Sequence, residues 1–196
     1  FSFFCFYLSI VYGIHININL YINLMIILVG MPCSGKSFYS KHFGSLVKVN
    51  NFDTDTVFTE KFQISPLNFI KINGWVKFRE GEYFVLNEFI NTEGTKERDI
   101  ILATGGGIIE YQPSYKLLES IKNNNRHKIV YLDISIDNYI KRYLEREEKI
   151  QYKYEEMVEL YNKRVNKFRN ISDYSIDCNN LNNSINNLQE LKELLN

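Results

Sequence analysis

The sequence predicts an α/β protein in which strand–helix–strand units build a parallel sheet. Apolar runs bounded by turn residues alternate along the chain with stretches of helical periodicity. The first of these runs, MIILV, leads directly into the glycine-framed loop GMPCSGKS, a context typical of a strand that turns into a helix around a phosphate. At 196 residues, the chain is long enough for one domain with a sizeable core.

The elements are expected in a regular order. Each expected strand is a short apolar run that ends at a glycine-rich, acidic or asparagine-rich stretch, and a helical pattern follows most of them. The expected strands are MIILV (25–29), LVKVNNF (46–52), DIILAT (99–104), HKIVYLDI (127–134) and YSIDC (174–178). The expected helices are Ser37–Phe43, Trp75–Asn91, Ser114–Asn123, Asp137–Leu144 and Tyr154–Phe168, with a weaker final helix over Ile185–Leu195.

Charge and cysteine content restrict the partners. Lys plus Arg and Asp plus Glu number 23 each, so the net charge of zero gives no general reason to expect nucleic acid or a membrane surface. Cys5, Cys33 and Cys178 are too few and too scattered for a disulfide framework or a zinc site. We therefore expect a cytoplasmic monomer that acts on small molecules. Cys33 lies inside the glycine loop, where a reactive thiol is one alternative.

Residues 1–24 are expected to lie outside the domain, which would occupy residues 25–196. The segment has no Lys, Arg, Asp or Glu and does not begin with Met. It lacks the basic start of a secretory signal, and its apolar part is interrupted too often for a membrane span. Translation of an upstream region, with Met25 as the true start, is the favoured interpretation, and a targeting or membrane segment is the alternative.

The loop itself satisfies the P-loop pattern, Gly30-x-x-x-x-Gly35-Lys36-Ser37. Glycines let backbone N–H groups point inward at phosphate oxygens, and the following helix adds the positive end of its dipole. The lysine ammonium would reach the β- and γ-phosphates, and the serine hydroxyl would ligate Mg²⁺. The pattern therefore predicts a site for a nucleotide and its magnesium ion.

Three further motifs follow in order. FDTD places Asp53 and Asp55 on one face of a strand end. One carboxylate could help to hold a metal ion while the other accepts a proton, or the pair could be an ordinary acidic helix cap. GWVKFREGE places Arg79 and Glu82 one helical turn apart on the same helix face. The two residues could belong to a ligand-binding site, or they could form a solvated ion pair on the surface. ATGGGII places the glycines 105–107 after a strand, where another group must approach the backbone closely or the chain makes a flexible turn.

Together, GMPCSGKS, DTD, FREGE and TGGG resemble the shikimate kinase family from about Met25 to Cys178. The gaps from Lys36 to Asp55 (55 − 36 = 19) and from Asp55 to Arg79 (79 − 55 = 24) also suit the family pattern. The resemblance implies a P-loop NTPase three-layer sandwich with a five-stranded parallel sheet of order 2-3-1-4-5, and a mobile lid near residues 145–153. It implies ATP, Mg²⁺ and shikimate as ligands.

The resemblance also assigns roles to residues. Those implied to bind ATP are Gly30, Pro32, Cys33, Ser34, Gly35, Lys36, Ser37, Phe38 and Arg142, with Ser37 and Asp53 at the metal. Those implied to bind shikimate are Asp55, Arg79, Gly105, Gly106, Gly107 and Arg164, with Glu82 steadying Arg79. The implied catalytic residues are Lys36, Asp55 and the lid residue Arg146, with Lys149 as the rival of Arg146. A solvated basic patch is the alternative for Arg164.

The chain departs from the family pattern in places. The lid LEREEKIQYKY is about four residues short and lacks an Arg-Pro step, while Trp75, Asn166 and Phe168 stand where an acidic residue, a proline and a tyrosine are usual. Two alternative functions therefore stay open. One is a related small-molecule kinase acting on gluconate or a nucleotide, and the other is a catalytically weak nucleotide-binding relative.

Overall fold

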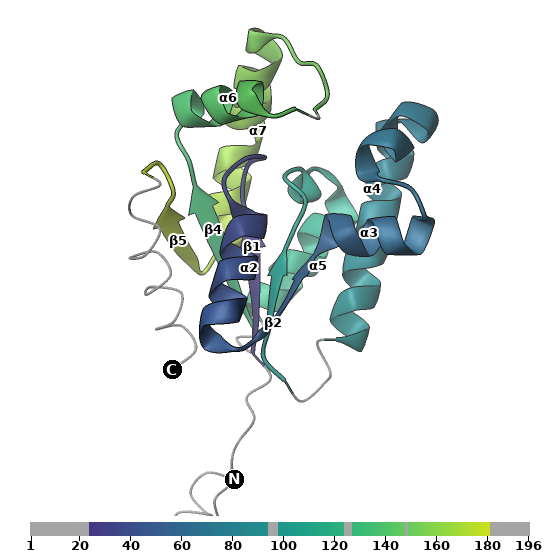
Figure 1. Cartoon of the computed structure of the whole chain (residues 1–196), viewed down its shortest axis with the longest axis vertical. Coiled ribbons are helices and arrows are strands. Elements are labelled where there is room, and N and C mark those ends of the chain that lie inside the picture. The colour runs from purple at the N-terminus through teal and green to yellow at the C-terminus, as the bar shows by residue number, and fades with distance from the viewer. Residues whose placement is uncertain (1–23, 94–97, 124–126, 148, 181–196) are drawn as a thin grey trace, which may run out of the picture.

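A five-stranded parallel sheet forms the centre of the molecule (Figure 1). The computed structural model describes residues 24–93, 98–123, 127–147 and 149–180. The strands are β1 (Met25–Val29), β2 (Asn50–Asp53), β3 (Ile100–Ala103), β4 (Lys128–Asp133) and β5 (Tyr174–Asp177). Their order is β2-β3-β1-β4-β5, which confirms the predicted fold class and strand order.

Helices cover both faces of the sheet because each central strand is apolar on both sides. Ile26 and Leu28 of β1 pack with α2 (Lys36–Val47) on one face. Met25, Ile27 and Val29 pack on the other face, against α5 (Gln112–Asn123), α7 (Tyr154–Ile171) and the second half of α4 (Pro66–Thr92). All five residues of β1 are at most 1% exposed. Truncating one of them to alanine would cost about 2–5 kcal/mol of stability.

A smaller aromatic core lies apart from the sheet, between α3 (Thr54–Phe62) and both halves of α4. Phe58 and Phe78 are buried there, with Phe62 and Phe69 packed against them. The sequence interpretation missed α3 and the first half of α4, which precedes a break at Gly74 with φ of 77°. These helices are stabilised by aromatic packing with each other, which local periodicity does not reveal.

Other boundaries also differ from the expectation. The strand expected at residues 46–52 was wrong at its start, because α2 continues to Val47 and the chain turns at Lys48, whose φ is 57°. A short 3₁₀ helix, η1 (Ile108–Glu110), precedes α5, and α6 (Ile136–Glu145) precedes the segment expected to form a lid. Among the described residues, no helix is both long and apolar enough to cross a membrane.

The expected N-terminal segment and final helix fall almost wholly outside the described residues. Leu24 is the exception: it is 9% exposed, and its backbone N–H donates to Asp99 Oδ1 at 3.0 Å. Its carbonyl accepts from Ile100 N at 2.9 Å. The ordered pairing therefore includes Leu24, one residue before the expected boundary at Met25.

Candidate active site

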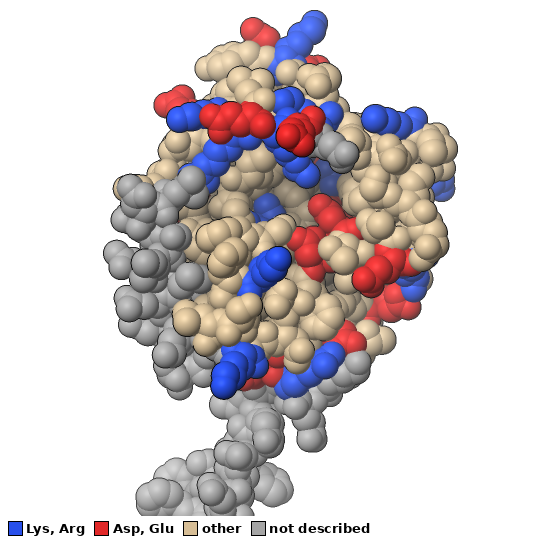
Figure 2. Space-filling model, in the orientation of Figure 1, with Lys and Arg blue, Asp and Glu red and all other residues tan. Residues whose placement is uncertain are grey.

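The carboxyl ends of β1, β2 and β3 meet at one edge of the sheet, and a pocket of about 700 Å³ opens there. Figure 2 shows it as a hollow with basic side chains above and acidic ones on its right side. The predicted residues that line it are Pro32, Cys33, Gly35, Lys36, Ser37, Phe38, Asp53, Asp55, Arg79, Glu82, Gly105, Gly106, Gly107, Arg146, Lys149 and Arg164. Gly30, Ser34 and Arg142 are outside this lining.

The P-loop joins the end of β1 to the start of α2. Gly35 has a φ of 99°, a left-handed conformation that favours glycine, and α2 begins at the next residue. Lys36 is 7% exposed, and its Nζ donates to the carbonyls of Gly30 at 3.0 Å and Met31 at 2.7 Å. Burial lowers the pKa of Lys36 to about 8, partly offset by the charge of Asp55. A phosphate that entered the loop would supply the negative charge that this buried ammonium lacks.

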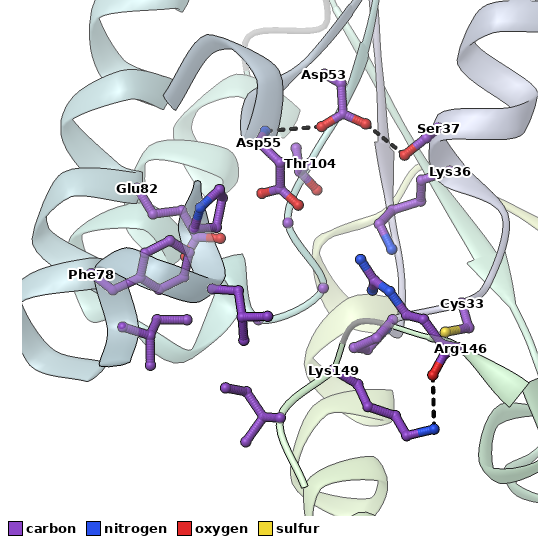
Figure 3. A pocket seen from close by; sticks show the side chains of 18 of the residues that line it. Cys33, Lys36, Ser37, Asp53, Asp55, Phe78, Glu82, Thr104, Arg146 and Lys149 are labelled. Carbon is purple, nitrogen blue, oxygen red and sulfur yellow. Dashed lines mark hydrogen bonds between the residues drawn. The ribbon is translucent and has the colours of Figure 1, made fainter. Parts of the chain in front are cut away.

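Asp53 connects the P-loop to the start of α3 (Figure 3). Its Oδ2 accepts from Ser37 Oγ at 2.5 Å, and its Oδ1 accepts from the backbone N–H of Asp55 at 2.9 Å. Asp53 is therefore a helix cap, as one sequence interpretation had it, and it also bonds the P-loop serine. Its role beside a metal ion stays a prediction. A serine hydroxyl beside a carboxylate is the pair of hard oxygen donors that Mg²⁺ prefers, so these residues fit that ion.

Asp55 occupies the first turn of α3 and faces the same pocket. Asp55 is exposed to solvent at the pocket, yet desolvation by the surrounding protein and the neighbouring carboxylates of Asp53 and Glu82 raise its pKa to about 6. A carboxylate with a pKa near neutrality is suited to accept a proton from a hydroxyl group.

Arg79 projects from α4 into the other half of the pocket. Its Nη1 donates to Glu82 Oε2 at 2.6 Å, and its guanidinium lies 5.0 Å from the centre of the Trp75 ring. The two side chains of the ion pair are 11% and 3% exposed. This burial excludes the interpretation of Arg79 and Glu82 as a solvated surface pair. Glu82 holds the polar edge of the Arg79 guanidinium, and the Trp75 ring packs on its face.

The three consecutive glycines make room for other protein groups. A Cβ at Gly105 would lie 2.1 Å from Glu82 Oε1, and one at Gly107 would lie 2.0 Å from Arg79 Nη2. A Cβ at Gly106 would lie 2.6 Å from the backbone nitrogen of Pro32 in the P-loop. The close approach predicted from the sequence is thus made by the Arg79–Glu82 pair and the P-loop, while the glycines also line the pocket.

Arg164 reaches the pocket from α7 and is 4% exposed, which excludes the solvated basic patch for this residue. Its Nη1 donates to Gly106 O at 3.2 Å, and its Nη2 donates to Glu110 Oε2 at 2.7 Å. The same Glu110 oxygen accepts from Arg79 Nη2 at 3.0 Å, and Glu110 Oε1 lies 3.1 Å from Lys163 Nζ.

Sequence reasoning missed Glu110, although its position after the three glycines was a usable signal. The 3₁₀ helix η1 follows directly, with the Glu110 N–H bonded to Gly107 O at 2.9 Å, and this tight turn brings the side chain to the two arginines. Partial burial alone would raise the pKa of Glu110, but Arg164, Lys163 and Arg79 lower it to about 2. The carboxylate therefore stays charged throughout the working pH range.

Arg146 and Lys149, in the segment expected to form a lid, both line the pocket, but their side chains point in different directions. Figure 3 shows the Arg146 guanidinium turned toward Lys36 and the Lys149 ammonium turned to the Arg146 carbonyl, at 2.8 Å. Lys149 also donates to the carbonyl of Leu144. The positive charge of Arg146 acts to lower the pKa of both Cys33, in the phosphate loop, and Asp55, at the start of α3.

Two predictions about the nucleotide side need qualification. The Arg142 guanidinium donates to the carbonyls of Cys178 at 2.8 Å and Asn179 at 3.2 Å, so it ties α6 to the end of β5 beside the pocket. Burial raises the pKa of Cys33, against the lowering effect of Arg146 and Lys36, so the thiol stays protonated. The reactive-thiol alternative thus has no support from the structure.

Comparisons with known proteins agree with this geometry. The family model described as shikimate kinase matches residues 32–195. A shikimate kinase of Clostridium botulinum is 34% identical over 122 residues, which is 62% of this chain and 66% of that protein. The pentafunctional AROM polypeptide of Candida glabrata is 25% identical over 161 residues, 82% of this chain and 10% of that protein. The matches thus span less than two thirds of each of these two relatives.

Solved structures share the fold. The shikimate kinase of Acinetobacter baumannii in complex with shikimate aligns with a TM-score of 0.73 and 24% identity, covering 87% of this chain and 92% of that one. The shikimate kinase of Bacteroides thetaiotaomicron aligns with a TM-score of 0.73 and 21% identity, covering 88% and 98%.

Proposed function

The chain belongs to the shikimate kinase family, and we propose that it transfers the γ-phosphate of ATP to the 3-hydroxyl of shikimate in aromatic amino acid biosynthesis. The observation that carries the proposal is that one pocket joins a P-loop lysine to a carboxylate of raised pKa, a buried arginine and a second arginine that is largely shielded from solvent. That combination suits a phosphate donor on one side and a small hydroxy acid on the other.

On the donor side, Lys36 and the N–H groups at the start of α2 would bind the β- and γ-phosphates. Ser37 and Asp53 would hold Mg²⁺, which neutralises phosphate charge when bound. Arg146 would meet the transferring phosphoryl group, because its guanidinium faces the P-loop while the Lys149 ammonium is engaged by carbonyls. Phe38 and Arg142 would lie toward the nucleoside, and Arg142 would pack on adenine.

On the acceptor side, Arg79 and Arg164 would bind the carboxylate of shikimate, with Glu82 holding Arg79. Asp55 would accept the proton of the 3-hydroxyl as the new oxygen–phosphorus bond forms and ADP leaves. Much of the rate would come from positioning, because phosphoryl transfer needs little covalent help from the protein. A closed lid would exclude water, so that the phosphate reaches the alcohol.

Release of ADP tests the proposal directly. The full chain with MgATP should release ADP rapidly only when shikimate is present, with gluconate and nucleoside monophosphates as competing acceptors. Turnover on gluconate or a nucleotide instead would favour the related-kinase alternative. ATP binding without turnover on any acceptor would favour the catalytically weak relative. The monomeric state and cytoplasmic location stay predictions, which size-exclusion chromatography and cell fractionation would test.

A further inference from the structure

We propose that Glu110 is a positioning residue that joins the two guanidiniums of Arg79 and Arg164 into one preformed clamp for the acceptor carboxylate. The inference rests on the proposed function, because it deepens the acceptor side of that site. Glu110 itself would touch no substrate atom.

The geometry of one oxygen atom carries the inference. Glu110 Oε2 accepts from Arg79 Nη2 at 3.0 Å and from Arg164 Nη2 at 2.7 Å. The two arginines come from α4 and α7, which are distant in the sequence and approach this carboxylate from different sides. An acceptor shared by both arginines fixes the distance between their guanidiniums. The contact of Arg79 with Glu82 and the contact of Arg164 with Gly106 each hold only one arginine, so they do not fix that distance.

Glu110 lies where its carboxylate would not compete with the substrate carboxylate for the two arginines. Arg79 and Arg164 line the pocket, whereas Glu110 is outside the lining and its side chain is 15% exposed. It therefore holds the arginines from behind and leaves their pocket side open. A carboxylate inside the pocket would instead occupy the place of the acceptor.

Charge alone predicts the opposite effect of a substitution. Arg79, Arg164 and Lys163 contribute three positive charges around Glu82 and Glu110, so the cluster has one unmatched positive charge. Removing the charge of Glu110 would raise this excess and strengthen the binding of an anion if electrostatics decided. If positioning decides, the same change weakens binding, because the guanidiniums lose their fixed spacing.

The experiment compares Glu110→Ala and Glu110→Gln with the wild-type full chain. Binding of shikimate would be measured by calorimetry and by the fluorescence of Trp75, the only tryptophan of the chain, which lies 5.0 Å from Arg79. We expect Glu110→Ala to raise the shikimate dissociation constant about 10- to 100-fold, and Glu110→Gln, which keeps an acceptor oxygen, to raise it less. The dissociation constant for MgATP should stay unchanged.

Two controls make the result specific. The Lys163 side chain is 55% exposed and is the third cationic partner of Glu110. Lys163→Met removes this partner and leaves the bridge between the two arginines intact, so shikimate binding should change little. A shikimate analogue with a neutral hydroxymethyl group in place of the carboxylate should bind all of these proteins equally weakly. Thermal unfolding of each variant checks that it is folded.

Tighter or unchanged shikimate binding by folded Glu110→Gln would overturn the inference. An equal loss of MgATP binding would also overturn it, because it would indicate a general structural defect. Absence of shikimate binding by the wild-type chain would refute the proposed function, and the clamp with it. Normal wild-type binding with no effect at Glu110 would refute the clamp alone.

Discussion

Replacing Glu82 with glutamine isolates the buried ion pair that holds Arg79. The change removes one negative charge and keeps the shape of a side chain that is 3% exposed. Breaking a buried pair by removing one partner costs about 3–5 kcal/mol, because the remaining charge is left buried and uncompensated. Arg79 retains Glu110 at 3.0 Å, so we expect the lower end, about 3 kcal/mol.

The same helix provides a matched control. Lys77 and Glu80 also form an i,i+3 pair in α4, at 3.0 Å, but their side chains are 67% and 44% exposed. Exposed pairs of this kind contribute little, so Glu80→Gln should cost less than about 0.5 kcal/mol.

Urea unfolding of both variants measures the difference. With a slope of about 2 kcal/mol per molar urea, Glu82→Gln should lower the midpoint by about 1.5 M, and Glu80→Gln should hardly move it. Shikimate binding should weaken in Glu82→Gln alone. Equal midpoints for the two variants would refute the reasoning, because burial would then make no difference to the value of the pair.

Three other perturbations address the remaining parts of the pocket. Asp55 has a pKa of about 6 and would act as a base in its ionised form. The value of kcat/KM for shikimate should therefore fall about tenfold per pH unit below pH 6 and level off above it. A flat profile from pH 5 to 8 would exclude this role. Arg146→Met should reduce kcat far more than Lys149→Met, and two small losses would mean that another group meets the phosphate. Gly107→Ala should displace the Arg79 guanidinium and weaken shikimate binding selectively, at a stability cost of about 1–3 kcal/mol. Gly81→Ala, whose Cβ would lie 2.9 Å from the Phe58 ring, should destabilise the fold without that selectivity, and equal binding losses in the two variants would contradict the distinction.

The sequence predicted the sheet well because buried parallel strands are short apolar runs with sharp ends. MIILV and DIILAT differ from their observed strands by no more than two residues. The first half of α4 was missed because its hydrophobic pattern is weak and its stability comes from aromatic contacts with α3. Its start signal, Ser65 before Pro66, was present in the sequence.

The site was predictable to the extent that its motifs are local. Lys36, Asp55 and Arg79 each stand in a recognisable motif, and the structure brings them to one pocket. Glu110 was not predictable in the same way, because its role comes from two arginines on different helices. The reason for the three glycines was also hidden, since each makes room for a group from another part of the chain.

The position of β1 at the centre of the sheet has a consequence for folding during synthesis. Leu28 pairs with Ala103 on one side, and Val29 pairs with Tyr131 on the other. At about 5–20 residues per second, the ribosome would take roughly 5–20 s to make the chain between β1 and its last partner. MIILV would have no strand partner until β3 is made and would lack its second partner until β4 is made, so it is the expected binding site for a chaperone. Competence to bind ATP would be gained only after β4 has emerged.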